Sequence, residues 1–202
     1  RSFYLELISE HLAQEILDKL NLFRSNIIYI GGGGFYILTQ NTEYAKKELE
    51  KMKNEFNDWL YQEFEGKLFI NLEYIPFSGN DLNLNDAKSY GIQKVWMDLS
   101  EKIEISKKTK FYKKGDSKSL SKLFKITEPL SLTETCMVCG TDNKILITYK
   151  EEDEETSLRI CNSCESFINA GKNISSAKYI FKTTDSDNQI KGKFVTINKH
   201  RY

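Results

Sequence analysis

Ile27-Ile28-Tyr29-Ile30-Gly31-Gly32-Gly33-Gly34-Phe35-Tyr36-Ile37-Leu38 sets four consecutive glycines between two runs of apolar residues. β-Branched and aromatic residues on both sides of a glycine pair predict a β-hairpin whose turn needs positive φ. A two-residue turn requires only Gly32 and Gly33, so Gly31 and Gly34 are surplus to it and each adds a cost in backbone entropy. Two interpretations are open from this stretch alone. The turn is loose, or another backbone, a base or a phosphate approaches the tip closely.

Length and composition restrict the class of protein. A chain of 202 residues can bury a core, and one domain with a small appendage is its natural division. The hydrophobic share of 40% and the charged share of 29% are typical of a globular chain, and 29 basic residues balance 29 acidic ones. No apolar run approaches the roughly 20 residues that cross a bilayer. We therefore expect a cytoplasmic protein without a membrane partner, and the missing initiator methionine before Arg1 favours a fragment or a processed chain.

Three amphipathic helices and a further strand are predicted around the hairpin. Apolar residues at spacings of three and four predict helices over residues 3–20, 42–66 and 92–103. Alternating apolar and polar residues predict a strand over 68–76. Helix, hairpin, helix and strand in this order match the βαββαβ ferredoxin-like unit, with its first strand upstream of the first residue. The predicted fold class is therefore α+β.

Residues 107–131 depart from this pattern. Between Lys107 and Lys125 the sequence has eight lysines against one acidic residue, Asp116, with Phe111 and Tyr112 among them. Basic and aromatic residues together are able to bind a phosphate backbone or a nucleotide. The glycine and serines of the same stretch are equally typical of an interdomain linker, which is the interpretation that we favour.

Two C-x-x-C pairs form the second strong signal, Cys136/Cys139 and Cys161/Cys164. Each pair places two thiolates on one side of a tight turn, and Gly140 supplies a permissive backbone after the first. Together the pairs provide the four soft ligands of a tetrahedral structural zinc site, in a reducing compartment. Predicted strands on either side of an acidic tip complete a zinc ribbon, and a short helix is expected after it from Phe167 to Gly171. The competing interpretation is a redox dithiol, but a thioredoxin-like fold uses one pair after a strand.

These segments divide the chain. We predict a ferredoxin-fold domain over 1–106, a basic linker over 107–131 and a zinc-ribbon module over 132–175. Residues 176–202 are predicted to hold strands that lead to a further domain.

The combination resembles the large subunit of type III CRISPR effector complexes, of the type III-A kind. The residues that carry the resemblance are Arg1-Ser2-Phe3-Tyr4-Leu5-Glu6-Leu7, the hairpin from Tyr29 to Tyr36, and the helix end marked by Trp96, Lys107 and Phe111. They look like the first palm domain of that subunit, a ferredoxin-like fold of the nucleotide-cyclase kind. The cysteine ribbon is similar to the zinc linker that follows the palm. The match spans nearly the whole chain in the same order.

The resemblance implies activities that need more than this chain. In that family a nuclease domain precedes the first palm and cuts single-stranded DNA, and a second palm with a Gly-Gly-Asp-Asp hairpin follows the zinc linker. The paired palms make cyclic oligoadenylates from ATP when target RNA is bound. The implied partners are therefore the second palm of the same protein, other effector subunits, CRISPR RNA and target RNA. ATP and Mg²⁺ or Mn²⁺ are implied only for the full-length protein.

The hairpin of this chain has no carboxylate for such a cation. Palm enzymes hold one or two divalent ions by carboxylates at the hairpin turn and on the first strand, and here the turn positions are Gly33 and Gly34. We therefore assign no catalytic residue and expect the chain alone to be inactive. Open glycine amides remain suited to holding a nucleotide that is shared with the other palm. The expected nucleotide-binding residues are Gly31, Gly32, Gly33, Gly34 and Phe35.

Two other functions are compatible with these residues. The palm is alternatively a non-enzymatic docking scaffold for neighbouring effector subunits, with the glycines serving close packing between subunits. A degenerate relative of the diguanylate cyclases would have the same palm and a signalling role, but the zinc ribbon argues against that class.

Overall fold

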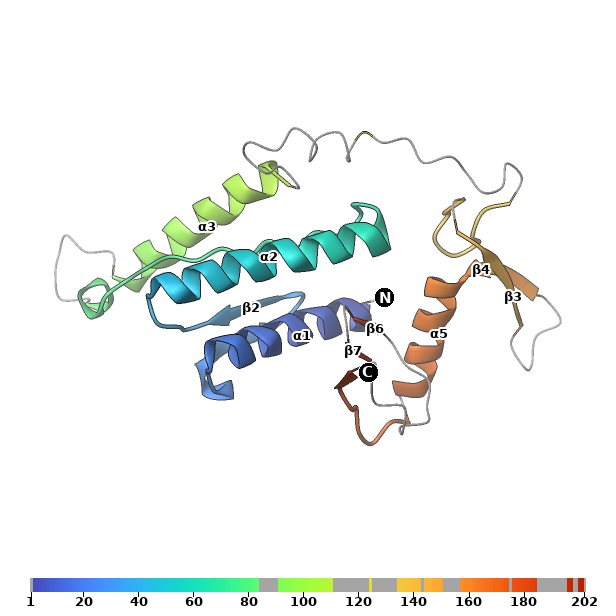
Figure 1. Cartoon of the computed structure of the whole chain (residues 1–202), viewed down its shortest axis with the longest axis horizontal. Helices are drawn as coiled ribbons and strands as arrows, with labels where there is room; N and C mark the ends of the chain where they lie inside the picture. The colour runs from blue at the N-terminus through green and yellow to red at the C-terminus, as the bar shows by residue number, and fades with distance from the viewer. Residues whose placement is uncertain are drawn as a thin grey trace. The chain divides into compact units, whose positions relative to one another are not determined.

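The computed structural model of the chain is a mixed α and β structure with small antiparallel sheets (Figure 1), and it contains a cysteine cluster. Two compact units are present, one made of 1–12, 29–35 and 126–202 and the other of 13–28 and 36–125. None of the described helices is both long and apolar enough to span a membrane. The structure describes residues 2–83, 91–110, 124, 134–142, 144–150, 157–174, 176–184, 196–197 and 200–201.

Helices α1 (Ser2–Leu20) and α2 (Glu43–Phe64) confirm the predicted apolar stripes. Helix α2 begins where the sequence predicted, because the hydroxyl of Thr42 accepts a hydrogen bond from the amide of Ala45 at 3.2 Å. It ends at two left-handed residues, Glu65 and Gly66, with φ of 55° and 79°. The buried apolar residues of α1 are Tyr4, Leu7, Ile8, Leu12, Ala13, Ile16, Leu17 and Leu20, and those of α2 are Ala45, Leu49, Met52, Phe56 and Leu60.

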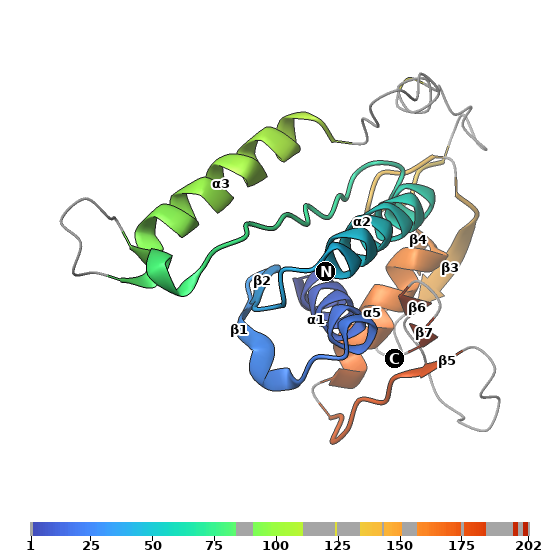
Figure 2. The same ribbon diagram turned by 60° about the vertical axis from the view of Figure 1, so that its left-hand side comes forward.

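The strand predicted over 68–76 is not formed. Residues 68–78 run as a segment without strand pairing beside α3 (Ile92–Lys108), itself predicted (Figure 2). A strand exists only with a hydrogen-bonding neighbour, and the neighbour expected in a βαββαβ unit is the first strand, which we placed outside this sequence. Side chains hold the segment instead. The amide of Asn57 on α2 accepts from the Ile70 N–H at 2.8 Å and donates to the Ile70 carbonyl at 2.9 Å.

Further side chains fix this segment between α2 and α3. The Asn71 amide donates to the Ile103 carbonyl of α3 at 2.8 Å. The largely buried Glu73 carboxylate pairs with Lys53 of α2 and lies 3.8 Å from the ammonium of Lys102 on α3. The expected α+β composition is thus present.

The cysteine region is built on β3 (Leu146–Lys150) and β4 (Ser157–Cys161), an antiparallel pair in which Leu146 lies opposite Cys161. Helix α5 (Asn162–Ile174) follows at once. The sequence predicted a shorter helix, from Phe167 to Gly171. A mid-helix glycine costs only about 1 kcal/mol and ends a helix mainly at positive φ, which Gly171 lacks.

Three short strands lie in the last predicted segment, in the order β5-β7-β6. They are β5 (Thr183–Thr184), β6 (Thr196–Ile197) and β7 (His200–Arg201). The predicted domain boundaries remain predictions. Most of the basic stretch 107–131 lies outside the described residues, as do the acidic tip 151–156 and most of 185–202.

Candidate functional site

The glycine hairpin consists of β1 (Ile27–Gly31) and β2 (Gly34–Ile37), joined by Gly32 and Gly33. Both connecting glycines have positive φ, +59° and +79°. Positive φ at both central residues is the requirement of a type I′ turn, whose twist matches that of the flanking strands. The structure therefore confirms the predicted hairpin and the two residues that turn it.

Gly31, one of the two surplus glycines, is explained by the chain itself. Its φ is +155°, a conformation that favours glycine, and a Cβ there would lie 3.3 Å from the hydroxyl oxygen of Tyr29. The Tyr29 side chain therefore lies over this side of the tip and still has 53% of its surface exposed. Sequence reasoning missed this role of Tyr29, although its position two residues before Gly31 places both on one face of the strand.

Gly34, the other surplus glycine, is not explained by the part of the chain that the structure describes. Its φ is not positive, and beyond its chain neighbours no heavy atom of the described residues lies within 4 Å of the position that a Cβ would occupy. A Cβ at Gly33 would also meet nothing within 4 Å. This side of the tip is therefore open, and Phe35 beside it is partly buried in β2. The five residues predicted to bind nucleotide thus form one continuous tip with a covered and an open side.

The base of the hairpin is closed by Asn26, a second residue that sequence reasoning missed. Its backbone carbonyl accepts from the Leu38 N–H at 2.8 Å, and its side-chain amide donates to the Leu38 carbonyl at 2.9 Å. Asn26 directly precedes β1, and Leu38 directly follows β2. No signal in the sequence indicates a side-chain hydrogen bond across 12 residues.

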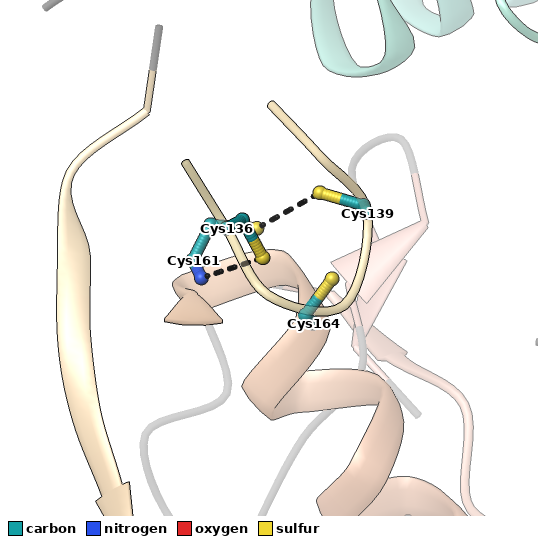
Figure 3. Close-up of side chains that lie close together, drawn as sticks. All are labelled: Cys136, Cys139, Cys161 and Cys164. Carbon is teal, nitrogen blue, oxygen red and sulfur yellow. Dashed lines mark hydrogen bonds between the residues drawn. The ribbon is translucent and has the colours of Figure 1, made fainter. Parts of the chain in front are cut away.

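The four cysteines converge, as predicted. Cys136 and Cys139 lie in the loop before β3, Cys161 ends β4 and Cys164 lies in the first turn of α5. Their sulfur atoms point toward one another (Figure 3), all lie within 4.8 Å, and those of Cys139 and Cys161 are 3.8 Å apart. Four thiolates bound at about 2.3 Å in a tetrahedron stand about 3.8 Å apart. The cluster therefore has the size and the donor atoms for a soft metal ion such as zinc.

Backbone hydrogen bonds shape this cluster. Gly140, at which the sequence predicts a permissive backbone, has the left-handed φ of +73°, and its N–H donates to the Cys136 carbonyl at 2.8 Å. The Cys161 N–H donates to the sulfur of Cys136 at 3.3 Å. Met137, next to the first ligand, donates its N–H to the Arg159 carbonyl of β4 at 3.0 Å. The loop and the strand are thereby joined beside the sulfur atoms.

The thiols of the cluster titrate differently. Burial raises the pKa of Cys136, but hydrogen bonds from the amides of Cys139, Cys161 and Val138 outweigh it and lower the pKa to about 6. Burial raises the pKa of Cys139, and it raises the pKa of Cys164 together with hydrogen bonds from the neighbouring thiols. Of these three thiols Cys136 is thus the one that most readily forms a thiolate. A divalent ion would displace the remaining protons, so its affinity falls as the pH is lowered.

Known proteins of similar sequence indicate the family of this chain. Residues 1–129 match the family described as Csm1 subunit domain B. The chain belongs to this family. Over 200 residues it is 33% identical to a protein of Mycobacterium tuberculosis named CRISPR system single-strand-specific deoxyribonuclease Cas10/Csm1 (subtype III-A), with 95% of this chain and 23% of that protein covered. The chain spans between 20% and 23% of the length of the curated relatives that it matches.

Solved structures of Csm1 are similar as well. One is a Csm1-Csm4 cassette in complex with one ATP, 33% identical with a TM-score of 0.53 over 62% of this chain and 16% of that chain. Another is the cassette in complex with cA4, 26% identical with a TM-score of 0.52 over 79% of this chain and 21% of that chain. In these two structures Csm1 is thus present together with Csm4 and with ATP or cA4.

Proposed function

We propose that the chain forms part of the large subunit of a type III-A CRISPR effector complex, with residues 1–106 as its first palm. The family match and the order of helix, hairpin and helix support a ferredoxin-like palm. The unpaired segment 68–78 supports it too, because the palm's first strand would supply the partner that this segment lacks. Cytoplasmic location and contacts with other effector subunits, CRISPR RNA and target RNA belong to the same proposal.

In this proposal the glycine hairpin binds an ATP molecule that it shares with the second palm. The observation that supports this role is Gly34, a glycine with an ordinary φ and open space at its Cβ position. Among the described residues nothing requires glycine there, which favours close approach of another molecule as the reason for it. The nucleotide-bound Csm1 structures are consistent with ATP or its products as that molecule.

The chemistry is divided between the two palms. The hairpin tip has no carboxylate, so the second palm supplies the groups that hold Mg²⁺ or Mn²⁺, and this chain supplies surface for the nucleotide. The paired palms then make cyclic oligoadenylates when target RNA is bound, and a separate nuclease domain cuts single-stranded DNA. This chain alone makes no oligoadenylate.

The ion of the cysteine cluster is Zn²⁺ in this proposal, with a structural role. Thiolates select soft or borderline ions, and four protein ligands leave no position open for substrate. Zinc in such a site contributes folding energy to a module with few buried residues of its own, here Cys136, Ile160, Cys161 and Cys164.

The test is Gly34→Val in the assembled effector complex. Valine suits a β-strand, and a Cβ at this position meets no heavy atom of the described residues within 4 Å beyond its chain neighbours, so we expect the fold to be retained. Loss of about 1.4 kcal/mol or more of nucleotide binding raises the KM for ATP roughly tenfold or more. Oligoadenylate synthesis is measured against ATP concentration, and target RNA binding is measured in parallel.

Gly79→Val is the matched control, because Gly79 is also exposed, has no positive φ and has open space at its Cβ position. It is expected to leave the KM unchanged. An unchanged KM in Gly34→Val contradicts nucleotide binding at the tip. If Gly34→Val instead weakens assembly with neighbouring subunits, the hairpin is a docking surface.

A further inference from the structure

The hydrogen bonds of Asn26 indicate a role for this residue that neither the sequence motifs nor the family match shows. The residue lies between the end of α1 and the start of β1, and its polar groups form hydrogen bonds both with the turn after α1 and with the base of the hairpin. On one side its N–H donates to the Phe23 carbonyl at 2.9 Å and its Oδ1 accepts from the Phe23 N–H at 3.1 Å. On the other side lie the two hydrogen bonds with Leu38. Asn26 therefore joins the turn after α1 to both strands of the hairpin.

The hairpin needs such hydrogen bonds at its base to be stable. Its strands have five and four residues and form a two-stranded sheet among the described residues. A hairpin of this size is marginally stable by itself. Both backbone groups of Leu38 are held by Asn26, so the pairing of the strands continues beyond β2 to the base. Slippage of the pairing by one residue would turn every side chain of the hairpin to the other face.

We infer that Asn26 is a positioning residue for the glycine tip. Its side chain fixes the base of the hairpin, and the strands transmit that constraint to the amides at Gly33 and Gly34. This inference rests on the proposed function, because positioning matters for ATP only if the tip holds ATP.

The chemistry of the amide is specific. The contact with the Phe23 N–H needs an acceptor and the contact with the Leu38 carbonyl needs a donor, and an amide of this length supplies both. Aspartate has the same shape but only acceptors. In Asn26→Asp the bond from Phe23 is retained, and the bond to Leu38 is replaced by repulsion between a carboxylate and a carbonyl oxygen.

The experiment compares Asn26→Asp with Asn54→Asp in the assembled effector complex. Asn54 is exposed on α2 and donates to the Glu50 carbonyl within its own helix, so it provides the same chemical change away from the hairpin. Amide hydrogen exchange over residues 31–38 reports the hairpin, and the KM and kcat for ATP report the site. In Asn26→Asp we expect exchange and KM to rise roughly three- to tenfold, the effect of losing one hydrogen bond, with kcat and the unfolding temperature unchanged. Asn54→Asp is expected to change none of these quantities.

Each outcome separates this inference from the proposed function. Unchanged exchange in Asn26→Asp overturns the inference, even if Gly34→Val raises the KM. Raised exchange with an unchanged KM, while Gly34→Val raises the KM, overturns it as well, because the hydrogen bonds at the base then exist without serving nucleotide binding. Failure of the proposed function is seen by itself, as an unchanged KM in Gly34→Val.

Discussion

The glycine hairpin and the cysteine cluster are both built on a tight turn with glycine at positive φ, yet they differ in what they contain. The cluster holds its whole chemistry within the chain, since four sulfur atoms lie within 4.8 Å of one another. The hairpin tip offers backbone without functional side chains, and a Cβ at Gly33 or Gly34 would meet no heavy atom of the described residues within 4 Å beyond its chain neighbours. The cysteine cluster has all its ligand atoms within the described residues, whereas the hairpin tip would form a binding site only together with a second component.

This difference predicts that the two sites respond differently to mutation. A ligand cluster fails when one side chain is removed, because the remaining three hold a buried charge less well. A backbone surface fails when a side chain is added, because the added atoms occupy the space of the ligand. The first kind of change alters folding together with metal content, and the second alters binding alone.

The largest expected effect is loss of the cluster by Cys164→Ser. Apparent folding energies from structural zinc are about 10–16 kcal/mol, so loss of one thiolate is expected to release the ion and unfold residues 134–174. Metal content per chain should fall from one toward zero, and amide exchange of β3 and β4 should reach the rate of an unfolded chain. Elemental analysis and hydrogen exchange check the two results.

Asn162→Ser is the matched control for the cluster. It changes an exposed residue between Cys161 and Cys164 and removes no ligand. Metal content is expected to stay at one per chain. A full complement of metal in Cys164→Ser would contradict the four-cysteine site.

The cluster was predictable from sequence because its signal lies in side chains at fixed spacing. The same holds for the three apolar stripes, the Thr42 cap and the hairpin turn, each of which depends on residues close together in the chain. The strand over 68–76 was not predictable in this way. Apolar and polar residues do alternate over 68–76, but a strand also needs a neighbouring strand as hydrogen-bonding partner. Here the Asn57 side chain of α2 bonds to Ile70 instead.

A moderate effect is expected at Gly31, which sharpens the contrast within the hairpin. Alanine at Gly31 meets a positive φ and the Tyr29 hydroxyl at 3.3 Å, so local opening of the hairpin should become easier by about 1–3 kcal/mol. Gly34→Ala should stay within about 0.5 kcal/mol, because neither obstacle exists there. Native-state hydrogen exchange of the assembled protein measures both free energies.

Tyr29→Phe separates the two causes at Gly31. It removes the hydroxyl and leaves the positive φ, so Gly31→Ala should cost less in this background but still more than Gly34→Ala. Equal costs at Gly31 and Gly34 would contradict the division of the tip into a covered and an open side.

The roles of Tyr29, Gly34 and Asn26 could not be read from sequence for a common physical reason. Each depends on the three-dimensional neighbourhood of a residue and not on its type. Four adjacent glycines look alike in sequence. In the structure two turn the chain, one makes room for Tyr29, and one has no explanation among the residues that the structure describes.

The smallest expected effect concerns the support of the cluster by Arg159. Its guanidinium donates to the Thr148 hydroxyl and to the Glu134 carboxylate, each at 3.1 Å, and about half of both charged side chains is exposed. Exposed ion pairs of this kind contribute less than about 1 kcal/mol. Arg159→Ala should therefore retain one metal ion per chain and lower zinc affinity by less than about fivefold, measured by competition with a chelator.

The reason for so small an effect is that Arg159 holds the loop mainly through its backbone. The bond from the Met137 N–H to the Arg159 carbonyl does not involve the side chain and survives the substitution. If the small loss of zinc affinity in Arg159→Ala comes from the ion pair with Glu134, Glu134→Gln should lower the zinc affinity by the same factor. The double variant should then lose no more zinc affinity than either single variant. Added salt should then weaken the wild type more than Arg159→Ala, because screening acts only on the exposed pair. A loss of tenfold or more in Arg159→Ala would show instead that the side chain sets the position of Cys136, so that the cluster depends on an outer contact as the hairpin does.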